Sequence, residues 1–155
     1  MLSVLKGHQA EVVCVSFDPM SYFVATSSMD KKAILWNLET SKPIFVFDEH
    51  DGEVINVSFN TDGDKILTGS FDYTAKVWDV YNNELLFDLK EHSGEISSCH
   101  FSYSGTNVIT SSIDKTVKLW DLRKCNKSIH TFQGHTDEVL DCCFNLTGTK
   151  MASSS

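Results

Sequence analysis

The sequence predicts an all-β fold assembled from a four-stranded unit that repeats about every 42 residues. The first observation is that four marker residues recur at a fixed spacing. The second is that the segments between them are short and rich in β-branched and aromatic residues, without helical periodicity. The third is a length of 155 residues with 41% hydrophobic residues, which is enough for one domain with a core.

The markers keep one phase along the whole chain. Histidines recur at intervals of 42, 42 and 43, at His8, His50, His92 and His135. A Ser or Thr follows each His by 18 positions, at Thr26, Thr68, Thr110 and Ser153. An Asp follows the first three by 22 positions and a Trp by 28, at Asp30, Asp72, Asp114, Trp36, Trp78 and Trp120.

Each unit contains four strand-like segments bounded by turn residues. The first begins a few positions after the His, at 12–17, 54–59, 96–101 and 139–144. The second carries the Ser or Thr, at 23–27, 65–69, 107–111 and 150–154. The third ends near the Trp, at 33–37, 75–79 and 117–121. The fourth precedes the next His, at 43–48, 85–89 and 128–133. Four short strands in about 42 residues are typical of a β-propeller blade.

The pattern Gly-His followed by Trp-Asp gives the chain a resemblance to the WD40-repeat family over its whole length. The pattern stands as Gly7-His8 with Trp36-Asn37, Glu49-His50 with Trp78-Asp79, Glu91-His92 with Trp120-Asp121, and Gly134-His135. Glu replaces Gly twice and Asn37 replaces Asp once, which does not threaten the fold. The resemblance implies repeat units at about 7–48, 49–90, 91–133 and 134–155, the last one incomplete.

Three complete units and a truncated fourth predict an open arc and not a closed ring, since propellers close with about four to eight blades. We therefore expect residues 1–155 to be a single fragment of a longer WD40 propeller, with apolar faces exposed at its flanks. Two copies that together complete one ring are the alternative.

Repeated His, Thr and Asp residues suggest either a catalytic triad or a structural network. In the WD40 family these residues and the Trp form a hydrogen-bonded tetrad. By this resemblance the tetrads are His8-Thr26-Asp30-Trp36, His50-Thr68-Asp72-Trp78 and His92-Thr110-Asp114-Trp120, with His135 and Ser153 beginning a fourth. Three copies in phase favour architecture, because an enzyme needs only one such site. We expect no enzymatic activity.

Charge and cysteine content restrict the partners and the cofactors. The formal net charge is -8, which disfavours general binding to nucleic acids and to anionic membranes. No apolar run is long enough for membrane insertion. Five cysteines fit no metal spacing, and their odd number suits no closed disulfide set, which favours the reducing cytosol; we expect neither a metal nor a cofactor.

Protein binding is expected where loops gather at one end of the ring. The third position after each His is acidic in all four units, at Glu11, Glu53, Glu95 and Glu138. The position before each tetrad Asp is large and apolar, at Met29, Phe71 and Ile113. By resemblance to the family both positions lie on the narrower face of the ring, where they would form a partner-binding surface for basic residues. The alternative is that the glutamates are merely solvated or cap turns, while the apolar residues seal neighbouring blades.

Segments 58–79, 92–121 and 134–155 are similar to the family of dynein assembly factors with WD repeats. That resemblance implies an adaptor that links outer-arm dynein subunits to the intraflagellar transport particle. It implies residence in the cytoplasm and in the cilium or flagellum with its basal body. A general WD40 scaffold in signalling or in ubiquitin-ligase substrate recognition is the alternative, and an acidic surface disfavours recognition of phosphorylated motifs.

Overall fold

The computed structural model describes residues 4–124 and 127–155, and one of the five cysteines, Cys125, lies outside these residues. The described residues form four antiparallel sheets. The first contains β1 (Val12–Phe17), β2 (Phe23–Ser28), β3 (Ala33–Asn37) and β4 (Lys42–Phe47), and the second contains β5 (Val54–Phe59), β6 (Lys65–Ser70), β7 (Ala75–Asp79) and β8 (Leu85–Leu89). The third contains β9 (Ile96–Phe101), β10 (Asn107–Ser112), β11 (Thr116–Asp121) and β12 (Ser128–Gln133), and the fourth contains β13 (Asp141–Phe144) and β14 (Met151–Ser154).

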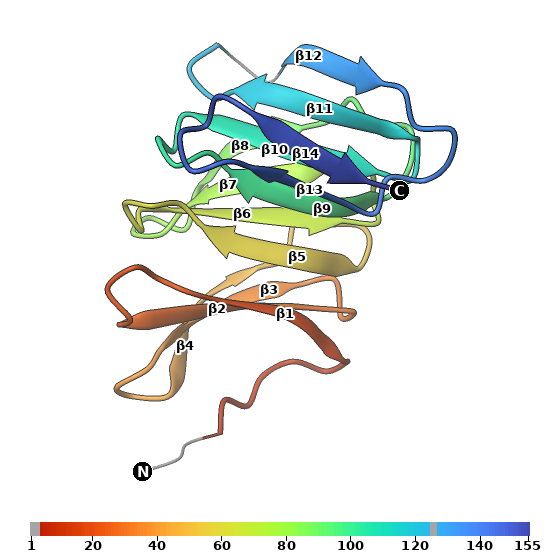
Figure 1. Cartoon of the computed structure of the whole chain (residues 1–155). Helices are drawn as coiled ribbons and strands as arrows, with labels where there is room; N and C mark the ends of the chain where they lie inside the picture. Colours follow the sequence, from red (N-terminus) through yellow and green to blue (C-terminus); the bar gives the residue numbers. More distant parts are fainter. Residues whose placement is uncertain (1–3, 125–126) are drawn as a thin grey trace.

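This architecture confirms the predicted fold class. The sheets stack one behind the other in chain order and form an open arc, with the first sheet at one end and the last at the other (Figure 1). The first strands β1, β5, β9 and β13 lie next to one another along the arc. Within the described residues no helix occurs that could span a membrane.

Both strands of the fourth unit start later than the sequence predicts: β14 begins at Met151 and not at residue 150, and the shift of β13 is larger. We expected the first strand of the fourth unit to cover 139–144, but β13 begins at Asp141. The reason is that the Val139 amide donates a hydrogen bond of 3.2 Å to the Ser112 carbonyl of the preceding sheet, so this residue belongs to the contact between sheets. The ladder with β14 then begins at the pair Asp141 and Ser154.

The core lies between consecutive sheets. Each junction buries apolar residues from both sheets, which removes apolar area from water on both sides, and at the first two junctions the Trp of the later sheet takes part. Between sheets 1 and 2 the buried residues include Ala25, Leu35, Phe47, Val54, Val57 and Trp78. Between sheets 2 and 3 they include Leu67, Val77, Leu89, Ile96, Cys99 and Trp120. Ile109, Val117, Val139 and Cys142 fill the third junction.

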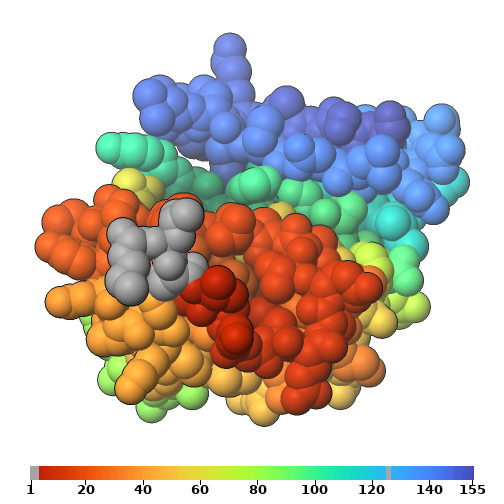
Figure 2. All heavy atoms as spheres, turned by 90° about the horizontal axis from the view of Figure 1, so that it is seen from below, coloured from red at the N-terminus to blue at the C-terminus, as the bar shows by residue number. Residues whose placement is uncertain are grey.

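The outer face of the first sheet is covered only in part, in contrast to the equivalent faces of the others. Val24, Ile34 and Trp36 are buried in a cluster with Leu5 and Leu38, whereas β1 is open. Val15 is 58% exposed, whereas Val57 in the same position of β5 is 2% exposed because the first sheet packs on it. Phe17 on the same strand is 60% exposed. Figure 2 views the molecule from this end of the stack, where the red and orange residues of the first unit form the surface.

Two sets of loops meet at one end of each of the first three sheets, and one of these sets continues to the fourth; we call this end the loop face. It consists of the segments 8–11, 50–53, 92–95 and 135–138, together with the turns 28–32, 70–74 and 112–116. The first strand of each complete unit has a bulge directly after this face. The evidence is a shift in strand register, which occurs between Val12 and Cys14, between Val54 and Asn56, and opposite Ser111 and Ser112. A bulge bends the strand locally, so the preceding loop folds over the end of the sheet.

Candidate protein-binding face

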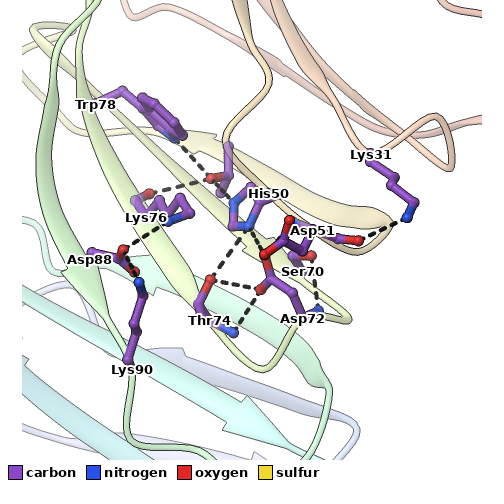
Figure 3. A network of polar contacts seen from close by, with 11 residues as sticks. Lys31, His50, Asp51, Ser70, Asp72, Thr74, Lys76, Trp78, Asp88 and Lys90 are labelled. Carbon is purple, nitrogen blue, oxygen red and sulfur yellow. Dashed lines mark hydrogen bonds and ion pairs between the residues drawn. The ribbon is translucent and has the colours of Figure 1, made fainter.

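A buried hydrogen-bond network fixes the loop face in each complete unit. In the second unit the imidazole of His50 has Nδ1 at 2.7 Å from Asp72 Oδ2 and Nε2 at 2.8 Å from Thr68 Oγ1. The indole Nε1 of Trp78 donates to the same Thr68 oxygen at 2.9 Å (Figure 3). The network therefore links a loop residue, two strands and a turn of one sheet.

The first and third units repeat this geometry closely. His8 lies 2.8 Å from Asp30 and 2.7 Å from Thr26, whose hydroxyl accepts a hydrogen bond of 2.8 Å from Trp36. The corresponding distances of the third unit are 2.7 Å for His92 to Asp114, 2.7 Å for His92 to Thr110, and 2.9 Å for Trp120 to Thr110.

The fourth unit contains one contact of this network. His135 Nε2 lies 2.8 Å from Ser153 Oγ, and this pair is exposed to solvent. Serine supplies the same hydroxyl as threonine, so the substitution keeps the contact.

The ionisation of the network follows from burial and hydrogen bonding. Burial lowers the pKa of His92, although its contact with Asp114 opposes this, so the imidazole is neutral at pH 7. Burial alone would raise the pKa of the Asp72 carboxyl, but hydrogen bonds from His50 and Thr74 hold it well below its usual range. With a neutral imidazole, Nδ1–H donates to the carboxylate and Nε2 accepts from the threonine hydroxyl, which leaves every member paired.

In the second and third units the threonine hydroxyl of the network is closed to solvent. The Thr68 and Thr110 side chains are buried, and their oxygens are occupied by Trp and His, so no substrate can reach them. A nucleophile must be accessible to its substrate. Because three units carry the same arrangement, we interpret the hydroxyl, imidazole and carboxylate as a repeated structural hydrogen-bond network.

Sequence reasoning missed two further groups in this network. The hydroxyls of Ser28, Ser70 and Ser112 accept hydrogen bonds of 3.1, 3.1 and 3.0 Å from the amides of the tetrad aspartates, and their spacing of 42 and 42 was an available signal. Thr74 and Thr116 donate hydroxyl hydrogen bonds of 2.7 Å to the other carboxylate oxygen of Asp72 and Asp114. Lys32 occupies that position in the first unit, so the pattern is broken there.

The structure brings the acidic and apolar positions of the loop face together in three units. The amides of Met29, Phe71 and Ile113 donate hydrogen bonds of 3.0, 2.9 and 3.1 Å to the carbonyls of Glu11, Glu53 and Glu95, respectively. Met29 and Phe71 are each 37% exposed, and Ile113 is partly exposed. In the fourth unit Glu138 is exposed, and the chain carries no such turn.

Lysines connect neighbouring sheets across the loop face. The Nζ atoms of Lys31 and Lys115 donate hydrogen bonds of 2.9 Å to the carbonyls of Asp51 and Thr136 in the next unit (Figure 3 shows the first). These two ammonium groups bind backbone carbonyls of the neighbouring sheet and not the carboxylates of the loop face. Within the part of the chain that the structure describes, none of the four glutamates forms an ion pair.

The other candidate groups do not form a second site. Cys142 is buried and its neighbour Cys143 is exposed, as expected for adjacent residues of a strand. Burial raises the pKa of the Cys142 thiol to about 12, so it is neutral and unreactive. Among residues 4–124 and 127–155, no group of three His, Cys, Asp or Glu side chains could hold a metal ion.

The chain belongs to the WD-repeat family. The family model described as WD domain, G-beta repeat matches residues 1–37, 41–79, 83–121 and 126–155. Each of the first three matches ends at the Trp-Asp or Trp-Asn pair, so one sequence repeat runs from the outer strand of one sheet to the third strand of the next. A search of curated proteins finds no match to the chain. WD40 repeats imply a protein-interaction scaffold, and proteins of this family are generally non-catalytic and typically bind other proteins.

Proposed function

We propose that this chain is a non-catalytic scaffold that binds a basic, partly apolar segment of a partner protein on its loop face. The observation that carries the proposal is the repeated hydrogen bond between a glutamate carbonyl and the amide of an apolar residue. It joins an acidic and an apolar residue at the backbone in three consecutive units. Such a surface offers apolar anchors for affinity and charges for selectivity and fast association.

The electrostatics of the chain support a basic partner. The formal net charge is -8, and the glutamates of the loop face add to it locally. Lys31 and Lys115 do not neutralise them, because their ammonium groups are bound to carbonyls of the neighbouring sheets. A field of one sign attracts ligands of the opposite charge and weakens with ionic strength. Capture of the partner should therefore decrease as salt is added.

More specifically, we propose that the partner belongs to the outer-arm dynein assembly system, and that the chain acts as an adaptor between dynein subunits and the intraflagellar transport particle. The resemblance of segments 58–79, 92–121 and 134–155 to dynein assembly factors with WD repeats supports this. The proposed location is the cytoplasm, with the cilium or flagellum and the basal body as the destination of the cargo.

The test is immunocapture of the protein from the cytoplasm of ciliated cells, comparing the double variant Glu53→Ala/Phe71→Ala with the wild type. We expect the double variant to lose the captured partner while its melting temperature stays close to that of the wild type. Side chains at both positions are partly exposed, and the hydrogen bond between them uses backbone atoms only. The matched control is Tyr81→Ala/Glu84→Ala, which removes an exposed aromatic and an exposed acidic residue from the turn after β7, at the opposite end of the same sheet.

The identity of the captured chains separates the two levels of the proposal. Outer-arm dynein chains that disappear in the Glu53→Ala/Phe71→Ala variant and persist in the control support both levels. Unrelated partners with the same dependence keep the binding face and reject the dynein adaptor in favour of a general scaffold. Equal capture by a folded double variant refutes the binding face.

A further inference from the structure

An ammonium group bridges two of the three junctions between neighbouring sheets at the loop face. Lys31 in the turn of sheet 1 reaches the Asp51 carbonyl of sheet 2, and Lys115 in the turn of sheet 3 reaches the Thr136 carbonyl that follows it. Both contacts are 2.9 Å, and both lysines have the left-handed backbone conformation, with φ values of 69° and 71°. The carbonyl directly after the tetrad His is therefore an acceptor for an ammonium group.

The middle junction lacks this bridge. Tyr73 occupies the position of the two lysines in the turn of sheet 2, with the same backbone conformation at a φ of 72°. The equivalent carbonyl of sheet 3 belongs to Ser93, which follows His92 as Asp51 follows His50. In the described portion of the chain, no hydrogen bond to the Ser93 carbonyl oxygen occurs, so the acceptor is free at this junction.

The residues around the free acceptor suit a cationic side chain. Tyr73 and Phe71 are 47% and 37% exposed and stand two residues apart on one turn. Aromatic faces attract an ammonium group within about 6 Å of the ring centre. Glu53 pairs through its carbonyl with the Phe71 amide, and Glu95 lies two residues after Ser93, so both carboxylates belong to the segments that border the junction.

We propose that the junction of Tyr73, Phe71, Ser93 and Glu95 binds a lysine side chain of the partner, in the place where the other two junctions hold a lysine of this chain. The inference rests on the proposed function and names the residue type that the partner presents. The ammonium donates to the Ser93 carbonyl, its methylene groups lie against Phe71 and Tyr73, and Glu95 and Glu53 contribute negative charge. Lysine fits better than arginine, because a single carbonyl acceptor matches a compact ammonium and leaves a planar guanidinium fork partly unpaired.

The test is a nuclear magnetic resonance titration of the protein with the capped peptide acetyl-Gly-Lys-Gly-amide, and with the same peptide carrying norleucine in place of lysine. We expect the lysine peptide to shift the amide signals of Gly94 and Glu95 and the ring signals of Tyr73, and to show its own ε-methylene protons moved upfield by the aromatic rings. The norleucine peptide should leave these signals unchanged. Equal shifts with both peptides would overturn the proposal.

The decisive variant is Tyr73→Lys, which places at the middle junction the residue that the other two junctions already carry in the same backbone conformation. We expect the introduced lysine to bind the Ser93 carbonyl itself and to weaken peptide binding by at least about tenfold. The matched control is Lys115→Tyr, which makes the same exchange in reverse at another junction and should leave binding at Gly94 and Glu95 unchanged. Unweakened binding by a folded Tyr73→Lys protein, or the same weakening in Lys115→Tyr, refutes the lysine site.

The outcome is separable from that of the proposed function. If Glu53→Ala/Phe71→Ala abolishes capture of the partner while Tyr73→Lys keeps both capture and peptide binding, the binding face stands and the lysine site falls. If Tyr73→Lys abolishes peptide binding while both variants still capture the partner, the site binds lysine and the loop face is not the partner surface.

Discussion

Removal of one imidazole from a complete tetrad should destabilise the protein far more than removal of the equivalent imidazole from the incomplete one. In His50→Ala, two hydrogen bonds of 2.7 and 2.8 Å are lost from a side chain that is 0% exposed. Each polar group left unpaired in a buried position costs about 1–3 kcal/mol. Asp72 is partly exposed and keeps donors from Asp51 and Thr74, so we take the lower half of that range for it. The expected loss is about 2–5 kcal/mol in the free energy of unfolding.

The assay is thermal unfolding followed by circular dichroism. In a protein of this size about 1 kcal/mol corresponds to roughly 2–4 °C, so His50→Ala should lower the melting temperature by about 4–20 °C. His135→Ala is the matched control, because this imidazole has one contact, to Ser153, in a solvent-exposed setting. It should shift the melting temperature by less than about 2 °C, since exposed hydrogen bonds contribute little. An equal decrease in both variants, or no decrease in His50→Ala, would refute the view that each complete tetrad stabilises its own sheet.

Two further predictions concern pH and the close approach of backbones at the loop face. Acidification should destabilise the protein, because folding lowers the pKa of Asp30, Asp72 and Asp114. These carboxylates stabilise the folded state above their usual pKa of 3.8, and this contribution is lost as the pH falls through their pKa values in the folded protein. His92 acts in the same direction below its usual pKa of 6.5, since burial lowers its pKa in the folded state. Urea unfolding at several pH values between about 7 and 2 covers both effects, and a constant free energy of unfolding over this range would contradict them. Gly52→Ala should lower the urea midpoint by the equivalent of about 1–3 kcal/mol, because the added Cβ would lie 2.6 Å from the Asp72 amide nitrogen. Gly134→Ala, whose Cβ meets no atom within 4 Å, should leave the midpoint almost unchanged, and equal midpoints for the two variants would contradict the steric argument.

Most of the fold was predictable because each strand is marked in the sequence by its position relative to a repeated residue. The strand that follows His50 was expected at 54–59 and lies there, as does the strand that ends at Trp78 and Asp79. These boundaries follow from local turn residues and from alternation, both of which are visible in one chain. The start of β13 was not predictable in this way, because it depends on a hydrogen bond between Val139 and the preceding sheet.

The contacts between neighbouring sheets were the part that the sequence did not reveal. The bridges from Lys31 and Lys115 depend on a left-handed turn conformation, which lets a long side chain cross to the next unit. Lysine in a polar turn is otherwise unremarkable, since most lysines there are simply solvated. Likewise the hydroxyls of Ser28, Ser70 and Ser112 recur in phase, but only the structure shows that they accept from the aspartate amides.

The tetrad and the loop face share the same loops and turns. The tetrad side chains fix the positions of these loops, whereas the neighbouring side chains are available for binding. His50 and Glu53 share one loop, and Asp72 follows Phe71 directly, so the bond of 2.7 Å between His50 and Asp72 also sets how close Glu53 lies to Phe71. Glu53 and Phe71 meet through a backbone hydrogen bond of 2.9 Å, which any two non-proline residues at these positions could form. Their side chains are consequently free to vary without loss of the frame, whereas His50 and Asp72 are not. A substitution at Glu53 or Phe71 should therefore change binding without changing the melting temperature, and a substitution at His50 should change both.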